Sequence, residues 1–274
     1  MISKGTTHEV RIDRDSGIVV KRFRSWSRGE PVREWTALTL LARFAPGLAP
    51  VPVSADLGGD PPTLTMTWLP GAEMATAPVA PARAGALAAA LERLWQSVPS
   101  PEREFPPVLT PNPVAFTDQV HRMAAAHPAL GDHPDVARAY ATAVAWLDRG
   151  SAARHASAAH RTVLGHGDPC LANFLWDAGQ VRLIDFEDAG PSDRAFELAI
   201  LTEHISAWSD ASLEADEFLS LFGLTTAETA RVHDFRRLAA LFWLIMLRPG
   251  SRSSARNPPG TQQRQAHRLL QLLA

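Results

Sequence analysis

The feature that most constrains this chain is a change of pattern at Pro70-Gly71. Before it, short apolar segments broken by Gly, Pro and Asp clusters are typical of strands and turns. After it, the chain becomes Ala-rich with helical spacing, as in residues 81–97. At 274 residues the chain is short for two independent domains. We therefore expect a two-lobed unit, with a strand-rich lobe over residues 1–70 and a helical lobe over residues 71–274.

The first lobe is predicted to contain an antiparallel sheet. Residues 8–23 indicate two strands, because a polar cluster suited to a hairpin turn separates them at residues 14–17. Apolar residues then recur at helical spacing from Pro31 to about Ala45. Residues 50–57 and 63–69 indicate two further strands. The lobe should be a small sheet with one helix packed on it.

The second lobe is predicted to be helical, with one β-like interruption. That interruption covers residues 162–190, where a loop at Asp168-Pro169 precedes a hairpin that turns at residues 177–179. The fold class is therefore α+β. The expected helices of this lobe cover about residues 81–97, 113–127, 134–158, 193–208, 212–222, 226–247 and 261–273.

Charge and cysteine content exclude several classes of protein. The net charge is −2, from 27 basic and 29 acidic residues, and no basic stretch is dense enough to bind nucleic acid. The single cysteine, Cys170, forms neither an internal disulfide nor a zinc cluster. The N-terminus lacks a signal-peptide core, and the longest apolar run, residues 238–247, is about half a membrane span. We expect a cytoplasmic protein with no membrane or nucleic-acid partner.

The residues that carry chemistry lie in the β-like interruption. Phosphoryl transfer requires Mg²⁺ and Lys to neutralise the nucleotide, and a carboxylate near the acceptor hydroxyl. In protein kinases that carboxylate precedes a metal-binding Asn by five residues, and a metal-binding Asp follows beyond a hairpin. Here Asp168 precedes Asn173 by five residues, and Asp185 follows in the apolar frame Leu183-Ile184-Asp185-Phe186. The order and spacing indicate a kinase-type phosphotransferase.

The same segment carries a family resemblance. His166-Gly167-Asp168, the following Pro169-Cys170-Leu171-Ala172-Asn173-Phe174, and Asp193-Arg194-Ala195-Phe196-Glu197-Leu198-Ala199 are the motifs concerned. On these motifs the chain resembles the aminoglycoside phosphotransferase family, with its choline, homoserine and fructosamine kinase relatives, which implies a bilobal protein-kinase-like fold. The resemblance is specific near residues 163–199, moderate near 19–41 and absent for the substrate-binding helices, so it does not identify the acceptor.

The resemblance implies a role for each matching position. Asp168 would accept or orient the proton of the acceptor hydroxyl, while Asn173 and Asp185 would hold Mg²⁺ between the β- and γ-phosphates. Lys21 would contact the α- and β-phosphates, and Glu34 would hold Lys21 by an ion pair. These residues would make ATP or GTP the phosphoryl donor.

The nucleotide base and the covering loop are less well defined. Thr67, Trp68 and Leu69 lie where the interlobe hinge is expected, so their backbone groups would bind a purine, although a strand end broken by Pro-Gly explains them equally well. The loop over the phosphates is represented only by residues 4–8, with one glycine. The family's Asp before Leu-Ala is Glu197 here, with Asp193 upstream, so the residue that braces the loop is ambiguous.

Each assignment has a simpler alternative. Asp168 and Asn173 alone would be turn residues, and Asp185 would be an ion-pair partner, but a buried carboxylate after an apolar strand is costly unless it is paired or metal-bound. Lys21 has Arg22 as a rival, although strand alternation points the two side chains in opposite directions. Glu34 has Glu30 as a rival.

Three functions remain open at this point. The leading hypothesis is phosphorylation of a hydroxyl on a small molecule, and the alternatives are a catalytically silent nucleotide-binding module and a metal-dependent hydrolase. An aminoglycoside or another antibiotic is one acceptor class, since many acidic residues follow the catalytic segment, but such charges usually face solvent. Trp208 and Trp243 fit a core or cleft wall better than a choline cage. The acidic residues are Glu187, Asp188, Glu203, Asp210, Glu214, Asp216 and Glu217.

Overall fold

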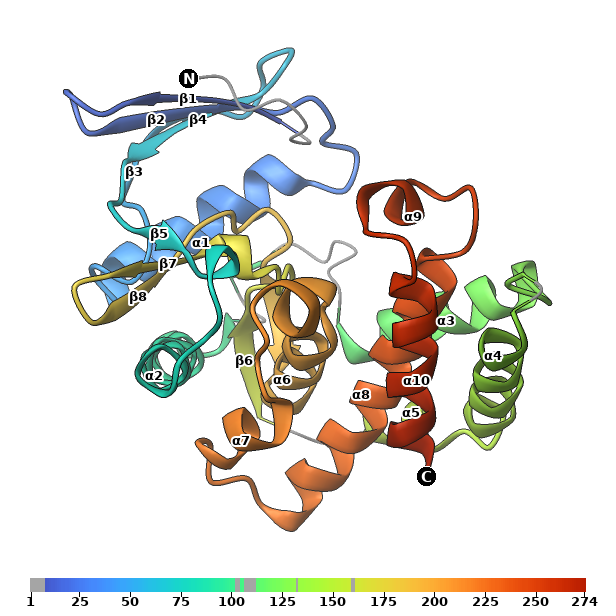
Figure 1. Cartoon of the computed structure of the whole chain (residues 1–274). Helices are drawn as coiled ribbons and strands as arrows, with labels where there is room; N and C mark the ends of the chain where they lie inside the picture. The colour runs from blue at the N-terminus through green and yellow to red at the C-terminus, as the bar shows by residue number, and fades with distance from the viewer. Residues whose placement is uncertain (1–7, 102–103, 106–111, 132, 159–160) are drawn as a thin grey trace.

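The protein is described by a computed structural model that covers residues 8–101, 104–105, 112–131, 133–158 and 161–274 (Figure 1). A small antiparallel sheet lies over a larger helical lobe, which confirms the predicted α+β fold. The strand order is β1-β2-β4-β3, so the central pair β2–β4 joins strands that are separated by a helix in the sequence. The four strands are β1 (Glu9–Asp13), β2 (Ile18–Arg22), β3 (Pro52–Asp56) and β4 (Thr63–Thr67).

Helix α1 (Glu30–Phe44) packs beneath this sheet (Figure 1). Proline occupies its first turn, where the missing N–H has no intrahelical partner to lose. Leu38 and Leu41 are almost fully buried, and β4 alternates so that Leu64 and Met66 are buried on the same side. The apolar face of the helix, which repeats every 3.6 residues, and that of the strand, which repeats every two residues, therefore form one apolar layer.

A second sheet connects the lobes. Strand β5 (Ala72–Glu73) pairs with β7 (Phe174–Asp177), which forms a hairpin with β8 (Gln180–Leu183). The predicted lobe boundary at residue 70 falls between β4 and β5. The amide of Leu183 donates to the Leu48 carbonyl at 2.9 Å, which ties the hairpin to the chain that follows α1.

The segment predicted to be catalytic adjoins a third, two-stranded sheet. Strand β6 (Thr162–Gly165) pairs with β9 (Gly190–Asp193), and the 3₁₀ turn η3 (Leu171–Asn173) leads into β7. The predicted loop followed by a hairpin is therefore present. The ends of β6 and β9 hold the loop before β7 and the segment after β8 next to each other.

Helix α8 is the centre of the helical lobe. It packs against α3, α5, α6 and α10, and Phe235, Leu238 and Leu241 on it are fully buried. Within the described ranges, no helix is long and apolar enough to cross a membrane. The helices are α2 (Pro81–Ser97), α3 (Pro113–Ala126), α4 (Pro134–Leu147), α5 (Ser151–Ala156), α6 (Arg194–Glu203), α7 (Ala215–Ser220), α8 (Thr226–Met246), α9 (Arg252–Arg256) and α10 (Thr261–Leu273).

Two of the predicted helices are interrupted. The helix expected over 134–158 divides into α4 and α5, because Gly150 adopts a left-handed conformation with φ of 73°. The helix expected over 193–208 ends at Glu203, and His204 adopts extended backbone angles. The chain then forms η4 (Ser206–Asp210), a π-helical turn that contacts η3. This break brings η4 against η3 in the segment predicted to be catalytic.

Candidate active site

The loop after β6, residues 166–173, is fixed mainly through its backbone. The amide of His166 donates to Glu197 Oε2 at 3.0 Å, and Glu197 Oε1 accepts from the Ser192 hydroxyl at 2.7 Å. The His166 ring contacts the Ile184 carbonyl through Nε2 at 2.8 Å. Glu197 thus braces the loop, whereas Asp193 caps α6 and pairs with Arg231. This arrangement resolves the ambiguity between the two carboxylates.

Gly167 allows the loop to pass very close to the segment after β8. Its φ is 80°, a left-handed conformation, and a Cβ at this position would lie 2.1 Å from the Asp188 carbonyl oxygen. No side chain larger than hydrogen fits there without a shift of backbone. Glycine is therefore required in the middle of His-Gly-Asp, because the loop packs directly against the segment after β8.

The loop presents Asp168 and Asn173 together. The Asn173 side-chain nitrogen donates to Asp168 Oδ2 at 2.9 Å, and the Cys170 amide donates to Asp168 Oδ1 at 3.2 Å. Because the nitrogen end of the Asn173 amide contacts Asp168, its oxygen end is left for a cation. The Ile184 amide donates to the Asn173 carbonyl at 3.0 Å, which places Asn173 beside the residue before Asp185.

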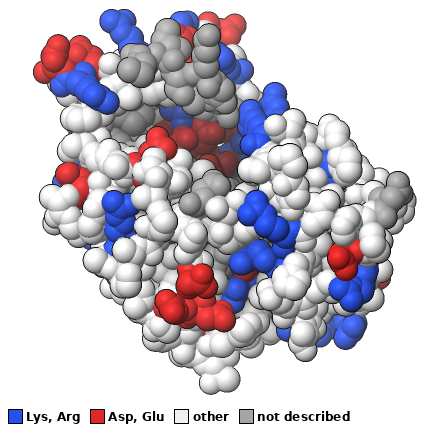
Figure 2. Space-filling model, viewed as in Figure 1, with Lys and Arg blue, Asp and Glu red and all other residues white. Residues whose placement is uncertain are grey.

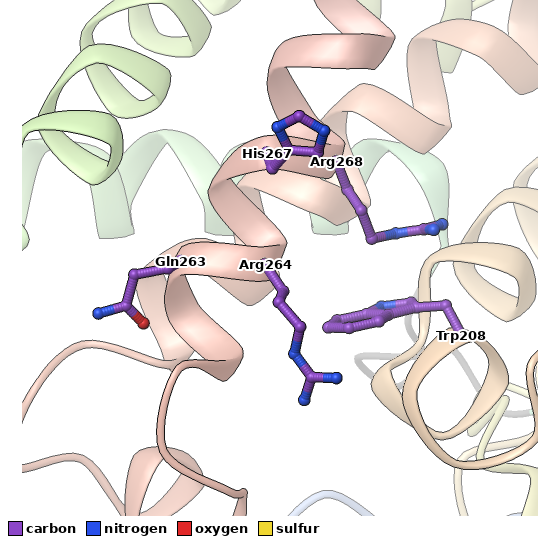
Figure 3. Close-up of a pocket in the computed structure, with 5 residues that line it drawn as sticks. All are labelled: Trp208, Gln263, Arg264, His267 and Arg268. Carbon is purple, nitrogen blue, oxygen red and sulfur yellow. The ribbon is translucent and has the colours of Figure 1, made fainter.

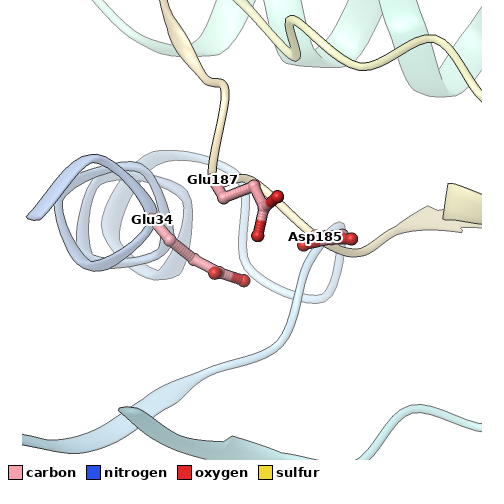
Figure 4. A group of neighbouring side chains, drawn as sticks. All are labelled: Glu34, Asp185 and Glu187. Carbon is pink, nitrogen blue, oxygen red and sulfur yellow. The ribbon is translucent and has the colours of Figure 1, made fainter. Parts of the chain in front are cut away.

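The amine of Lys21 lies at the centre of three carboxylates, which Figure 4 shows, and we call these four residues the Lys21 centre. Its Nζ atom is 2.7 Å from Glu34 Oε2, 2.5 Å from Asp185 Oδ1 and 2.7 Å from Glu187 Oε2. One oxygen from each carboxylate lies within 4.8 Å of the others. The structure thus brings Lys21, Glu34 and Asp185 together, from β2, α1 and the end of β8. The rival residues point elsewhere: Arg22 is exposed, and Glu30 binds Arg28.

Burial and mutual attraction set the protonation of this centre. Burial by itself lowers the pKa of the Lys21 amine, but Glu34, Asp185 and Glu187 outweigh it and raise that pKa well above its usual value. Burial raises the pKa of the Glu187 carboxyl, yet hydrogen bonds from His8 and Lys21 lower it overall to about 2. Burial raises the pKa of the Glu34 carboxyl to about 7, against the attraction of Lys21. One ammonium faces three carboxylates, so the centre favours a further cation.

This surplus of carboxylate oxygen fits Mg²⁺, which prefers hard oxygen ligands. The Asp185 side chain is 39% exposed, and its contact with Lys21 uses only Oδ1. Asp185 has φ of 66°, a left-handed conformation that Asp and Asn tolerate better than other side chains do. Figure 2 shows the acidic atoms recessed in a hollow between the two lobes. Asp185 thus presents an accessible oxygen that fits such an ion, whereas the side chain of Asn173 is buried beside it.

Two carboxylates of the segment after β8 hold the small lobe, a role that sequence analysis missed. Glu187 contacts Lys21 and also His8, whose Nε2 lies 2.6 Å from Glu187 Oε2. Asp188 Oδ1 lies 3.0 Å from Arg28 and 3.2 Å from the buried Arg33. The only signal in the sequence was their position directly after Asp185. Both are among the acidic residues that the sequence offers to a cationic acceptor, but in the structure both form ion pairs with basic residues of the small lobe.

The hinge and the covering loop give less information. The Thr67 amide donates to the Val51 carbonyl at 2.9 Å, and the Trp68 amide donates to the Gly17 carbonyl at 2.7 Å. A purine at this hinge would therefore use other backbone groups of the segment, which ends at Leu69. The covering loop is predicted over residues 4–8, and residues 4–7 of it lie outside the described residues.

Comparisons with known proteins agree with this fold. The model of the phosphotransferase enzyme family, APH, matches residues 2–235 of the chain. No curated protein matches it significantly. Among solved structures, a choline/ethanolamine kinase family protein from Mesorhizobium loti is 16% identical, with a TM-score of 0.66 and coverage of 99% of this chain and 86% of that chain.

Two aminoglycoside phosphotransferases have the same fold. APH(3″)-Id from Streptomyces rimosus, in complex with ADP and streptomycin, is 19% identical with a TM-score of 0.59, over 89% of this chain and 92% of that chain. The GDP complex of aminoglycoside 2′-phosphotransferase-IIIa is 16% identical with a TM-score of 0.61, over 99% and 89%. Likeness at this level of identity shows the fold, and it confirms the predicted kinase-like architecture.

Proposed function

Because the chain belongs to the phosphotransferase enzyme family, we propose that it transfers the γ-phosphoryl group of ATP or GTP to a hydroxyl group of a small molecule, with Mg²⁺. The single observation that supports this most strongly is the Lys21 centre, in which Lys21 of the small lobe contacts both Glu34 of the same lobe and Asp185 of the large lobe. In this proposal residues 1–70 bind the nucleotide, and residues 71–274 carry the catalytic loop and bind the acceptor.

The Lys21 centre would position the donor. Lys21 binds the α- and β-phosphates, and Glu34, which is buried, holds the amine in place through the 2.7 Å ion pair. The backbone of Thr67, Trp68 and Leu69 at the hinge contacts the purine. When bound by Asp185 and Asn173, Mg²⁺ neutralises negative charge on the β- and γ-phosphates. The protein thus supplies positioning and charge, which dominate phosphoryl transfer.

Asp168 would handle the proton of the acceptor. Its carboxylate is oriented by the Asn173 side chain and the Cys170 amide, which leaves it to accept the hydroxyl hydrogen. The acceptor oxygen bonds to the γ-phosphorus, the bond from that phosphorus to the β,γ-bridging oxygen breaks, and the nucleoside diphosphate leaves. The proton passes to Asp168. Asp168 is the catalytic residue of this proposal.

The proposal is tested with Asp168→Ala in an assay that detects an added phosphoryl group by mass, with ATP and GTP over aminoglycosides, other antibiotics, amino alcohols and sugars. Turnover should fall by about 10²–10⁴-fold, as expected for loss of a general base, while Mg²⁺-nucleotide binding persists. Asp148→Ala, at an exposed position after α4, is the control and should retain turnover. Full activity in Asp168→Ala contradicts the assignment. Nucleotide binding without transfer by the wild type would instead indicate a silent binding module.

A further inference from the structure

A depression of about 490 Å³ lies between η4 and α10, outside the Lys21 centre (Figure 3). Its lining combines one aromatic ring with basic and polar side chains of the last helix. We call it the arginine pocket, and its lining residues are Trp208, Gln263, Arg264, His267 and Arg268. The composition is unusual for a cation site, because the charges that line it are positive.

The pocket is built around the indole of Trp208. The guanidinium carbon of Arg264 lies 5.4 Å from the centre of the ring, and that of Arg268 lies 5.2 Å from it. Figure 3 shows the two side chains on opposite faces of the ring. A quaternary ammonium or an amino group would need such a face. The protein's own arginines already occupy both faces, so the pocket does not act as an aromatic cage for cations.

The positive charge of the pocket is incompletely neutralised. Arg268 pairs with Glu203 at 3.0 Å, but Glu203 also pairs with Arg236 at 2.8 Å. Among the side chains that the structure describes, Arg264 donates hydrogen bonds only to hydroxyls, Thr261 Oγ1 at 3.2 Å and Ser209 Oγ at 3.4 Å. Its remaining N–H groups can therefore bind a carboxylate or phosphate in a fork.

Acidic residues do lie nearby, in an adjoining depression of about 730 Å³ that shares Trp208 and Arg268. Of these, Asp216 pairs with Arg236 at 2.8 Å. Glu214 and Glu217 line the adjoining depression and not the arginine pocket. The two arginines beside Trp208 therefore determine the charge that a ligand in the arginine pocket meets.

The arginine pocket adjoins the catalytic loop through η4. The Ser206 hydroxyl accepts a hydrogen bond from the Leu171 amide at 2.9 Å, and Trp208 follows two residues later on the same turn. Figure 2 shows basic atoms on the same face as the acidic hollow between the lobes. A molecule bound beside Trp208 is thus held by the same turn, η4, that contacts the loop carrying Asp168.

We infer that the arginine pocket binds the anionic group, a carboxylate or a phosphate, of the hydroxylated acceptor. This inference rests on the proposed function, because it assigns the acceptor class of the same site. Arg264 and Arg268 are held against Trp208 before the ligand arrives, which limits the side-chain entropy lost on binding. A polycation such as an aminoglycoside would meet two guanidinium groups of like charge. The acceptor is therefore a hydroxy acid or a phosphorylated hydroxy compound.

The test compares ligands that share a carbon skeleton but differ in charge: gluconate, glucose 6-phosphate, glucose and glucosamine. Binding to the full chain is measured by titration calorimetry, and phosphoryl transfer from Mg²⁺-ATP and Mg²⁺-GTP is measured by mass. The two anions should bind at least about tenfold more tightly than glucose, with glucosamine weakest. The comparison of the two anions identifies whether the pocket prefers a carboxylate or a phosphate.

Arg264→Ala should weaken binding of the preferred anion by at least about tenfold and leave Mg²⁺-nucleotide binding unchanged. This variant should fold, because among the described side chains Arg264 only donates to the hydroxyls of Thr261 and Ser209 and lies against the Trp208 ring. Arg138→Ala, at an exposed position on α4, is the matched control and should bind like the wild type. Undetectable anion binding at millimolar concentration, glucosamine binding as tight as that of the anions, or an unaffected Arg264→Ala overturns the inference. Intact nucleotide binding and transfer to another acceptor in the same experiment would show that only the acceptor class was wrong.

Discussion

The Lys21 centre and the loop 166–173 adjoin each other where Ile184 contacts Asn173, yet they are held in different ways. The Lys21 centre consists of side-chain charges from three distant segments, with one ammonium among three carboxylates. The loop 166–173 is held through backbone amides, which donate to the buried Glu197 carboxylate and the Ser206 hydroxyl, and through one tight glycine contact. A charged centre can exchange partners when a nucleotide and a cation bind. A loop fixed through its backbone cannot, so it keeps one geometry.

Under the proposed function, the difference follows from the task of each region. Donor binding would bring several negative phosphate charges and a metal ion, so the residues that receive them must be charges that can change partners. In-line transfer requires the catalytic carboxylate within a few tenths of an ångström of one position, which rigid support provides. We therefore expect substitutions in the Lys21 centre to affect ligand binding and turnover, and substitutions that support the loop to affect folding.

The largest effect is expected for Asp185→Asn. Turnover should fall by about 10³-fold, because metal-assisted neutralisation contributes several kcal/mol to the barrier. The melting temperature of the ligand-free protein should be unchanged or higher, since one of three carboxylates that repel each other is neutralised. Asn also tolerates the left-handed backbone at this position. Thermal melts and initial rates with varied Mg²⁺ measure both effects.

Asp177→Asn, in the same hairpin, is the control for that variant. Asp177 pairs with Arg182 at 2.9 Å and takes no part in the Lys21 centre, so its turnover should remain near that of the wild type. A drop in melting temperature for Asp185→Asn as large as that of a loop variant would contradict the distinction between the two regions. It would mean that the charges are structural.

The second effect, on stability, is expected for Gly167→Ala. The new Cβ would meet the Asp188 carbonyl oxygen at 2.1 Å, and the backbone has φ of 80°. Strain and overpacking together should cost about 3 kcal/mol or more. Gly179→Ala is the matched control, because its φ is 86° but nothing lies within 4 Å of its Cβ; it should cost about 1 kcal/mol. Urea denaturation measures both, and equal losses would show that the close approach is unimportant.

The local part of this site could be predicted from the sequence. Asp168, Asn173 and Asp185 follow one another within a single loop and hairpin, so spacing along the chain sets their spacing in space. The contact between Lys21 and Glu34 could be predicted for a similar reason, because strand alternation and helical periodicity orient each side chain. Their chemical roles remain proposals, since the structure places the residues together without showing the reaction.

The contacts between distant segments could not be predicted in this way. The pairing of Asp188 with Arg28 and Arg33 depends on how the lobes dock, over more than 150 residues of sequence. The break in the helix after Glu203 was missed because apolar periodicity continues through it. A continuous helix over these residues gave no reason to expect that Trp208 would line a pocket with α10. Tertiary packing, not local preference, determines these features.

The smallest effect is expected for Ser206→Ala, and it examines whether η4 positions the loop. The Ser206 hydroxyl is buried and accepts from the Leu171 amide at 2.9 Å. Its removal leaves that amide without its partner, which should cost about 1–3 kcal/mol of stability. Ser220→Ala is the control: its exposed hydroxyl donates to the Glu217 carbonyl at 2.6 Å, so its loss should be nearly neutral.

Kinetics separate positioning from stability in the Ser206 variant. Because Ser206 acts on the loop and not on the Lys21 centre, kcat should fall severalfold at a temperature where the variant is fully folded, while the KM for nucleotide stays the same. A rise in nucleotide KM of the same size would contradict this expectation. It would show that a bond within the helical lobe also adjusts the Lys21 centre, and that the two regions respond as one unit.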